Sequence, residues 1–235
     1  MALFWKRAAV CMLVPYGGAF GFVSTAQNLS GSSMATYTKS NALKMMSDAT
    51  GSAAKKVLVP IADGSEEIES VTIIDTLVRA GAEVTVASVS PELQVTCSRG
   101  VKLVADKSIA DAAGETYDAI ACPGGLPGAN HLRDDPTLRA LLQAQNEAGR
   151  LVAAVCAAPA VVLQTHGLIA GRAATCYPAD QFKSAIENYS TDPVVVSGNL
   201  VTSQGPGTSL AFALALVAEL YGEEKASELK GQMLF

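Results

Sequence analysis

The chain has 235 residues and a net charge of −5 at neutral pH, with 49% hydrophobic and 17% charged residues. This composition is typical of a globular protein and excludes collagen-like, coiled-coil and wholly disordered chains. The negative net charge predicts no nucleic-acid-binding function. The five cysteines include no C-x-x-C pair, and the chain has only two histidines. The sequence therefore predicts neither a disulfide framework nor a metal site.

The beginning of the chain differs in charge from the rest. Residues 1–47 contain no Asp or Glu and are rich in Ser and Thr. Lys6 and Arg7 precede a short apolar run, residues 8–14, which is too short to span a bilayer about 30 Å thick. Such an order is typical of a signal peptide, and the Ser/Thr-rich stretch after it resembles a transit peptide. We interpret residues 1–54 as a disordered targeting segment for an organelle, with a plastid favoured and a mitochondrion or the cytoplasm as alternatives. No membrane association is expected once it is removed.

Residues 55–235 have the length of one α/β domain. Apolar runs bounded by turn residues predict strands at 57–61, 83–89, 119–121, 151–155, 194–196 and 200–202. Apolar residues at helical spacing predict helices over 65–81, 136–148 and 209–221. Strands that alternate with helices indicate a parallel sheet covered on both faces. Ligands bind such sheets at the carboxyl ends of the strands.

The first predicted helix carries a candidate proton carrier. Ser65 is a good N-cap residue. Glu69 falls on the same side of the helix as Ile73 and Thr76, so its side chain is expected to point inward. A carboxyl group in an apolar pocket has a raised pKa and can transfer protons. The alternative is that the three glutamates at the start of this helix are all solvated.

Cys156 follows the predicted strand 151–155 and leads into a helix-like apolar segment, residues 160–163. A nucleophile on a sharp strand-to-helix turn is accessible. We expect the N-terminus of the following helix to lower the pKa of this thiol and to favour the thiolate. The alternative is that Cys156 is a buried packing residue, as many free cysteines are.

Two glycines follow another predicted strand. Gly124 and Gly125 come after residues 119–122 and allow their backbone N–H groups to approach a substrate closely. The N–H groups of Gly125 and Ala157 together form a candidate oxyanion hole. The alternative is a tight turn without function. The chain has no phosphate-binding loop and no dinucleotide fingerprint, so a nucleotide cofactor is not predicted.

Three segments together resemble the ThiJ/PfpI superfamily, and among its branches that of the Parkinson-associated protein deglycase, DJ-one. These are Asp63–Glu69, Cys122–Gly125 and Ala154–Pro159. Cys97–Arg99 and Thr202–Ser209 match further segments of that family, and all five stand in the family's order. The resemblance covers nearly the whole domain of residues 55–235.

The resemblance implies an α/β fold, a flavodoxin-like three-layer sandwich with a mostly parallel sheet and a nucleophile elbow, usually as a homodimer. It implies that Cys156 is the nucleophile and that Glu69 is its protonated partner. Gly125 and Ala157 would supply the oxyanion N–H groups, next to Gly124 in the substrate-binding loop. Asp75 and Arg99 match residues at the dimer interface of the family.

The resemblance also implies two alternative functions. The first is an enzyme that converts methylglyoxal or a related 2-oxoaldehyde to a 2-hydroxy acid without glutathione, or that reverses early glycation adducts. In this reaction Cys156 adds to the aldehyde as a hemithioacetal, and neither a metal nor an organic cofactor is needed. The second is an oxidative-stress sensor or chaperone that works through oxidation of the same cysteine. The association of the family name with thiamine synthesis has no support in the sequence.

The chain departs from the family at two positions. Tyr177 stands where well-known members carry a histidine, so no Cys–His dyad forms there and Tyr177 is a candidate substrate hydrogen-bond donor. Gln204 stands where many relatives have an arginine. Ala157 replaces the histidine that follows the cysteine in the protease-like branch, which argues against peptidase activity.

The remaining histidines and cysteines have weaker candidate roles. His131 follows the Gly124–Gly125 loop and is a second candidate for substrate binding, although a solvated loop residue is the more common case. His166 is expected at a helix C-terminus. Cys97, Cys122 and Cys176 are predicted to be packing residues, with Cys97 also a secondary oxidation site.

Overall fold

The computed structural model describes residues 54–235. The predicted targeting segment, apart from Ala54, lies outside the described residues. Within residues 54–235, every helix is too short or too polar to cross a bilayer.

A central sheet organises the domain, with strand order β10-β11-β7-β6-β1-β2-β5. All neighbouring strands run parallel except β10 and β11, which form an antiparallel edge. The strands are β1 (Lys56–Ile61), β2 (Glu83–Ser88), β5 (Lys107–Ser108), β6 (Ala119–Cys122), β7 (Leu151–Val155), β10 (Val194–Ser197) and β11 (Leu200–Ser203). Two small sheets lie apart from it, formed by β3 (Gln94–Thr96) with β4 (Lys102–Val104) and by β8 (Ala173–Ala174) with β9 (Asn188–Tyr189).

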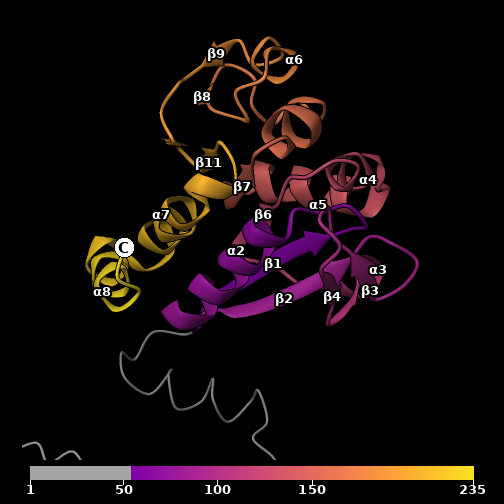
Figure 1. Cartoon of the computed structure of the whole chain (residues 1–235), viewed down its shortest axis with the longest axis horizontal. Helices are drawn as coiled ribbons and strands as arrows, with labels where there is room; N and C mark the ends of the chain where they lie inside the picture. The colour runs from indigo at the N-terminus through magenta and orange to yellow at the C-terminus, as the bar shows by residue number, and fades with distance from the viewer. Residues whose placement is uncertain (1–53) are drawn as a thin grey trace, which may run out of the picture. The chain divides into compact units, whose positions relative to one another are not determined.

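Helices cover both faces of the sheet (Figure 1). On one face lie α2 (Glu67–Ala80), α7 (Ser209–Tyr221) and α8 (Glu223–Gln232). On the other face lie α3 (Ile109–Ala112), α4 (Gly128–Asp134), α5 (Pro136–Glu147) and the π-helix η1 (Pro159–Gln164). The short α6 (Asp180–Lys183) lies between β8 and β9, and the 3₁₀ turn η2 (Pro206–Thr208) precedes α7. This arrangement confirms the predicted three-layer, mostly parallel α/β fold.

The central strands are apolar along their whole length because both faces are buried. In β1, Val57, Val59 and Ile61 contact the core beneath α2 and α7, whereas Leu58 contacts the opposite core. All four side chains are 0% exposed. A continuous apolar run of this kind is the expected signature of a doubly covered parallel strand.

The N-cap of α2 differs from the prediction. Glu66, not Ser65, caps the helix, because its carboxylate accepts a hydrogen bond from the Glu69 N–H at 2.8 Å. The Ser65 hydroxyl does not cap the helix, because it accepts a hydrogen bond from the Ala62 N–H at 2.9 Å and closes the turn after β1.

Gly128 allows the first residues of α4 to pack directly on the turn after β1. A Cβ at this position would meet the backbone of Ser65 and would lie 2.6 Å from the Gly64 carbonyl carbon. We expect Gly128→Ala to lower the free energy of unfolding by about 1–3 kcal/mol, because backbone atoms cannot move aside as a flexible side chain can. Chemical denaturation would measure this. Gly114→Ala is the matched control, since nothing lies within 4 Å of its Cβ position; an equal loss in both variants would contradict the packing argument.

Candidate active site

The candidate site lies at the carboxyl ends of β1, β6 and β7. The strand order reverses between β1 and β6, since β2 follows on one side of β1 and β6 lies on the other. Such a switch point is where open α/β sheets bind ligands. The loops after the two strands meet there, because the Glu66 N–H donates to the Gly124 carbonyl at 3.0 Å.

Cys156 forms a nucleophile elbow directly after β7. Its φ angle is +64°, a left-handed conformation that non-glycine residues rarely adopt. The neighbouring chain holds this conformation: the Cys156 N–H donates to the Ser203 carbonyl at 3.0 Å, and the Cys156 carbonyl accepts from the Tyr177 N–H at 2.7 Å. Cys156 is partly exposed, whereas Cys97, Cys122 and Cys176 are buried as predicted.

Glu69 lies beside Cys156, on the first turn of α2. The side chains of Glu69, Ile73 and Thr76 are all 0% exposed, which confirms that this side of the helix points inward. The Glu69 Oε2 atom accepts a hydrogen bond from the Gly124 N–H at 2.7 Å. No described donor or acceptor reaches Oε1, and the charge of an ionised Glu69 raises the pKa of the Cys156 thiol. Because Oε2 accepts the Gly124 N–H, Oε1 is the atom on which Glu69 would carry a proton.

The predicted oxyanion donors lie next to the same side chain. The backbone N–H groups of Gly125 and Ala157 act to lower the pKa of the Cys156 thiol, and both residues line the pocket over it. Gly125 has a φ angle of +85°, which suits glycine. A Cβ at Gly124 would lie 2.6 Å from the Cys156 Cβ atom, so only glycine allows this close approach.

The two acidic groups of the site, Glu69 and Cys156, share one negative charge above about pH 7. Burial raises the pKa of Glu69 to about 7, and the nearby Glu66 carboxylate adds to this increase. Burial and the charge of an ionised Glu69 raise the pKa of the Cys156 thiol to about 12, against the lowering effect of the Gly125 and Ala157 N–H groups. The pair therefore loses its first proton near pH 7 and keeps the second.

The predicted lowering of the Cys156 thiol pKa by a helix N-terminus is therefore wrong while Glu69 is ionised. The segment after Cys156 is a six-residue π-helix, Pro159–Gln164, rather than a long α-helix, and burial beside a carboxylate dominates. When Glu69 holds the proton, its negative charge no longer raises the pKa of the thiol. The Gly125 and Ala157 N–H groups still act to lower that pKa. The proton position within the pair then decides whether the sulfur is a thiolate.

A pH profile follows from this shared charge. The reactive pair carries one negative charge, and below its first pKa it is fully protonated. We expect kcat/KM for an aldehyde substrate to rise as the pH increases through about 7 and then to level off. Steady-state rates measured from about two pH units below that value to about two units above it would test this profile. A profile that falls with pH over this range would contradict the assignment.

A pocket of about 600 Å³ opens over Cys156. Its walls are formed by Glu66, Ile68, Ser98, Arg99, Gly125, Leu126, Ala157, Tyr177, Phe182 and Pro206. Arg99 is held there through Glu67, whose carboxylate accepts hydrogen bonds from the Arg99 N–H and the Ser98 hydroxyl, both at 2.8 Å. These bonds contribute to a lowered pKa of Glu67 against the opposing effect of burial.

Several sequence candidates lie away from this pocket. His131 is exposed, is not part of the pocket wall, and contacts the Asp63 carbonyl oxygen through Nδ1 at 3.0 Å. Asp75 is exposed on α2 and pairs with Arg79 at 2.7 Å. His166 contacts the Arg133 carbonyl through Nε2 at 3.0 Å, so it binds the last turn of α4 rather than its own helix. The Gln204 side chain donates to the Thr191 carbonyl at 2.8 Å.

The sequence analysis gave no site role to six wall residues or to Glu67. Leu126 and Phe182 lie outside the segments that resemble the family, whereas Glu66, Ile68, Ser98 and Pro206 lie within them without a predicted role. Glu67 looked like one more solvated charge at a helix start, although it is 8% exposed. Only the folding of distant loops onto α2 brings these residues to the site.

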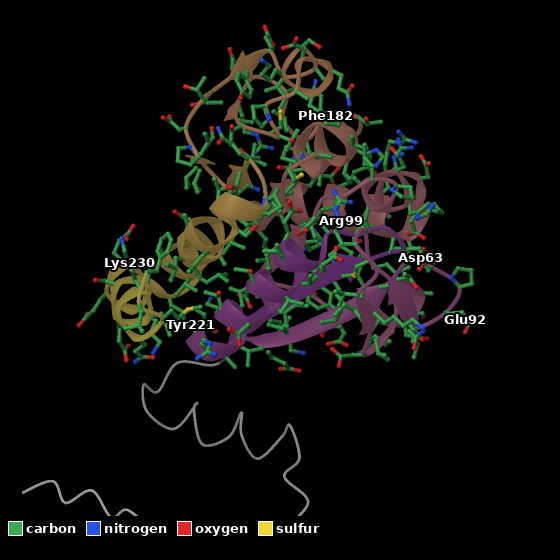
Figure 2. All side chains as sticks on the ribbon, viewed as in Figure 1. Asp63, Glu92, Arg99, Phe182, Tyr221 and Lys230 are labelled. Atoms are coloured by element: carbon green, nitrogen blue, oxygen red, sulfur yellow. The ribbon has the colours of Figure 1, made fainter. Side chains whose placement is uncertain are left out.

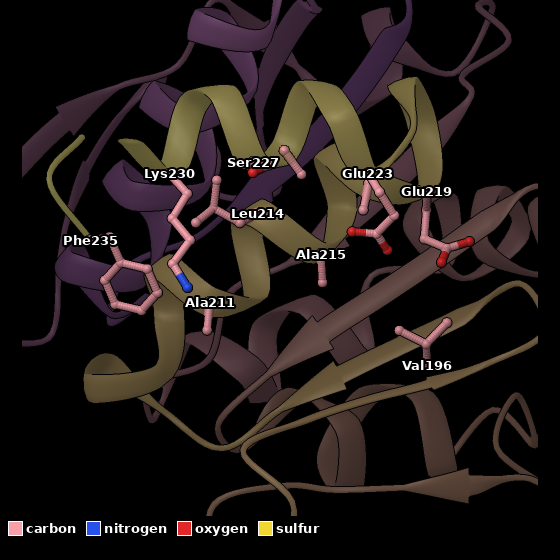
Figure 3. A pocket seen from close by; sticks show the side chains of 11 residues that line it. Val196, Ala211, Leu214, Ala215, Glu219, Glu223, Ser227, Lys230 and Phe235 are labelled. Carbon is pink, nitrogen blue, oxygen red and sulfur yellow. The ribbon is translucent and has the colours of Figure 1, made fainter. Parts of the chain in front are cut away.

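A second groove, of about 430 Å³, lies between α7 and α8 and contains no residue of the Cys156 pocket (Figure 3). Val196, Leu214 and Phe235 form its apolar part, and Glu219, Glu223 and Lys230 form its charged rim. It holds no cysteine or histidine. No group of three metal-ligating side chains occurs in residues 54–235.

Sequence comparison assigns the chain to a family. The model of the DJ-1/PfpI family matches residues 55–219. The chain belongs to this family. Its described part therefore shares the flavodoxin-like fold of the DJ-1 proteins, as the sheet order also shows.

Curated DJ-1 relatives come from plants and animals. "Protein DJ-1 homolog B" of Arabidopsis thaliana is 48% identical over 174 residues, 74% of this chain and 40% of that protein. "Protein dj-1beta" of Drosophila melanogaster is 42% identical over 183 residues, 77% of this chain and 97% of that protein. "Glutathione-independent glyoxalase DJR-1.2" of Caenorhabditis elegans is 40% identical over 174 residues, 74% of this chain and 91% of that protein.

Solved DJ-1 structures share the fold. "Toxoplasma gondii DJ-1, oxidized" is 50% identical, with a TM-score of 0.75 over 77% of this chain and 99% of that one. The Drosophila DJ-1beta crystal structure is 41% identical, with a TM-score of 0.74 over 77% of this chain and 98% of that one. The match spans less than half the length of the Arabidopsis homologs, 40% of B and 46% of A.

Proposed function

We propose that this protein is a cofactor-independent glyoxalase of the DJ-1/PfpI family, acting on methylglyoxal or related 2-oxoaldehydes, with protein deglycation as the same chemistry on a glycated side chain. The observation that carries the proposal is the left-handed Cys156 in the pocket wall next to Gly124, whose N–H binds the buried Glu69 carboxyl group at 2.7 Å. A relative that is 40% identical is named a glutathione-independent glyoxalase.

The geometry supports an addition step at the aldehyde. With the shared proton on Glu69, the Cys156 thiolate attacks the aldehyde carbon and forms a C–S bond, and the carbonyl electron pair moves to oxygen. The Gly125 and Ala157 N–H groups stabilise this oxyanion. The Glu69 proton then neutralises it, which leaves a hemithioacetal beside a Glu69 carboxylate.

Glu69 then moves a proton between neighbouring carbons. Its carboxylate removes the hydrogen of the former aldehyde carbon, the resulting enediol is reprotonated at the next carbon, and a thioester of the 2-hydroxy acid remains. Water cleaves this thioester and restores the thiol. The sum is one 2-oxoaldehyde plus one water giving one 2-hydroxy acid, so neither an oxidant nor a cofactor takes part.

The test is the formation of lactate from methylglyoxal by the full chain, without glutathione and with a metal chelator present. Lactate that accumulates in proportion to enzyme and time supports the proposal. Loss of methylglyoxal without lactate would overturn it.

The alternative function is oxidation sensing, with or without chaperone activity. One observation favours it: the solved relative from Toxoplasma gondii is described as oxidized. Cys156 is also the partly exposed thiol among four described cysteines. In this function a thiolate is oxidised by two equivalents of peroxide to a sulfinate. Mass spectrometry would show two oxygen atoms on Cys156 after mild peroxide, in a protein that forms no lactate.

We also propose a homodimer that uses α2 and the Arg99 loop. Ile68 and Val71 on α2 are 55% and 45% exposed, and Asp75 follows on the same helical face. Exposed apolar side chains on one helix face suit a protein interface. Sedimentation of wild type and of Val71→Glu would test it: a wild-type monomer would contradict the proposal.

For location, we propose that residues 1–54 direct the protein to an organelle, with a plastid favoured. The basic, acid-free and Ser/Thr-rich composition of this segment supports the proposal. Import of a fusion of residues 1–54 to a fluorescent protein would test it, and a cytoplasmic fusion protein would contradict it.

A further inference from the structure

The pocket over Cys156 is larger and more apolar on one side than methylglyoxal requires. Its volume is about 600 Å³. The apolar side consists of Ile68, Leu126, Tyr177, Phe182 and Pro206. Leu126 and Tyr177 are also strongly exposed to solvent, at 47% and 46%, whereas Ile68, 55% exposed in a single chain, belongs to the proposed dimer face. Apolar side chains gathered around a nucleophile indicate that an apolar group binds beside it.

Two aromatic rings in this pocket contact each other near the nucleophile. Tyr177 and Phe182 pack edge to face, with ring centroids 6.4 Å apart and an interplanar angle of 81°. The Tyr177 N–H donates to the Cys156 carbonyl at 2.7 Å, so the Tyr177 backbone is bound to the backbone of the nucleophile. Phe182 comes from the segment that contains α6, and Arg99 comes from the loop between β3 and β4 (Figure 2). The pocket lies between these two segments, since both side chains line it.

Charge does not favour a negatively charged substituent here. Glu66 and Arg99 both line the pocket and carry opposite charges. The Arg99 guanidinium donates to the Ser98 carbonyl at 3.2 Å, and Glu67 holds the Arg99 backbone. An apolar substituent is therefore the better match to this wall.

We infer that one part of this apolar side, formed by Leu126, Tyr177 and Phe182, is a substrate subsite. It would bind an aromatic or bulky apolar substituent on the ketone carbon of the 2-oxoaldehyde. This inference rests on the proposed glyoxalase function. An aryl group in this subsite leaves water and contacts the Tyr177 and Phe182 rings, whereas the methyl group of methylglyoxal leaves the subsite empty. The protein consequently favours phenylglyoxal over methylglyoxal, beyond their difference in intrinsic reactivity.

The test compares kcat/KM for phenylglyoxal with kcat/KM for methylglyoxal in the full chain. We expect this ratio to fall about tenfold in Phe182→Ala and in Leu126→Ala, because each substitution removes apolar contacts to the aryl group. Leu126 lies in an exposed loop, so its variant keeps the test valid if Phe182→Ala folds poorly. Phe235→Ala is the matched control: the ring lines the other groove, and the ratio should stay at the wild-type value.

A second readout does not depend on turnover. Phenacyl bromide and bromoacetone both alkylate a thiolate: a C–S bond forms, bromide leaves, and the thiol proton goes to the buffer. The rate ratio for Cys156, divided by the same ratio for a small free thiol, measures the contribution of the pocket. We expect it to exceed about ten in wild type and to fall toward one in Phe182→Ala.

The outcomes separate the inference from the proposed function. If methylglyoxal is converted but neither ratio changes in the two variants, the subsite is overturned and the glyoxalase function stands. If neither aldehyde is converted but the alkylation ratio falls as expected, the function fails and the subsite stands. A faster reaction with an oxoaldehyde that carries a carboxylate than with phenylglyoxal would assign the pocket to anions through Arg99 and would also overturn the inference.

Discussion

Replacement of Cys156 by alanine should abolish the formation of lactate from methylglyoxal. The side chain supplies the atom that forms the covalent bond to the substrate, and no other described cysteine is exposed enough to replace it. We expect kcat/KM to fall by at least about 10³-fold. Lactate would be measured by an enzymatic or NMR assay, with enough enzyme that the wild-type rate far exceeds the rate of the uncatalysed reaction.

Cys176→Ala is the matched control for this experiment. It removes a thiol that is 0% exposed and next in sequence to Tyr177, and it should keep most of the activity. Circular dichroism and thermal unfolding of both variants would show that the fold is intact. A Cys156→Ala protein that retains wild-type turnover would contradict the covalent mechanism, whatever the behaviour of Cys176→Ala.

Replacement of Glu69 by glutamine should lower kcat by about 10²–10⁴-fold, because the amide keeps a hydrogen bond to the Gly124 N–H but cannot transfer a proton between the substrate carbons. Covalent addition at Cys156 should survive, since an amide N–H can still donate to the sulfur. Mass spectrometry after a brief reaction should detect the hemithioacetal adduct on Cys156, and lactate should be released slowly.

The pH dependence of this variant gives an independent readout. Without the carboxylate, the charge that raises the pKa of the Cys156 thiol is gone. The thiolate absorbance in the ultraviolet should therefore appear at a pH below the raised pKa that the Cys156 thiol has beside an ionised Glu69. Glu223→Gln, on α8 in the second groove, is the control and should change neither rate nor titration. Equal kcat in wild type and Glu69→Gln would contradict the role of Glu69 as proton carrier.

The sequence predicted the central sheet well, for a physical reason. β1, β6 and β7 are buried on both faces, and their continuous apolar runs can be read without knowing their neighbours. The separate hairpin of β3 and β4 is short and half exposed, so its hydrophobic pattern carries little signal. Helix α8 was missed as well, because it is mostly charged and buries only Ala226 and Leu229.

The site was predictable where local geometry decides it. The inward direction of Glu69 follows from helical spacing, and the turn at Cys156 follows from a strand that ends in small residues. The pKa of the thiol was not predictable, because its burial and the effect of the Glu69 charge arise only when the fold brings α2 and the turn after β7 together. The prediction of Ser65 as the cap of α2 was wrong because its hydroxyl binds the Ala62 N–H in the turn after β1, which leaves the Glu69 N–H to Glu66.

The most direct measurement counts the lactate molecules that each protein chain forms. Full-length, freshly reduced protein would be incubated with a large excess of ¹³C-labelled methylglyoxal, without glutathione and with a chelator, and lactate would be counted by NMR against the Cys156 concentration. The account predicts many lactate molecules per chain, with Cys156 recovered as the free thiol. One methylglyoxal consumed per chain, with Cys156 left modified and no lactate released, would contradict it.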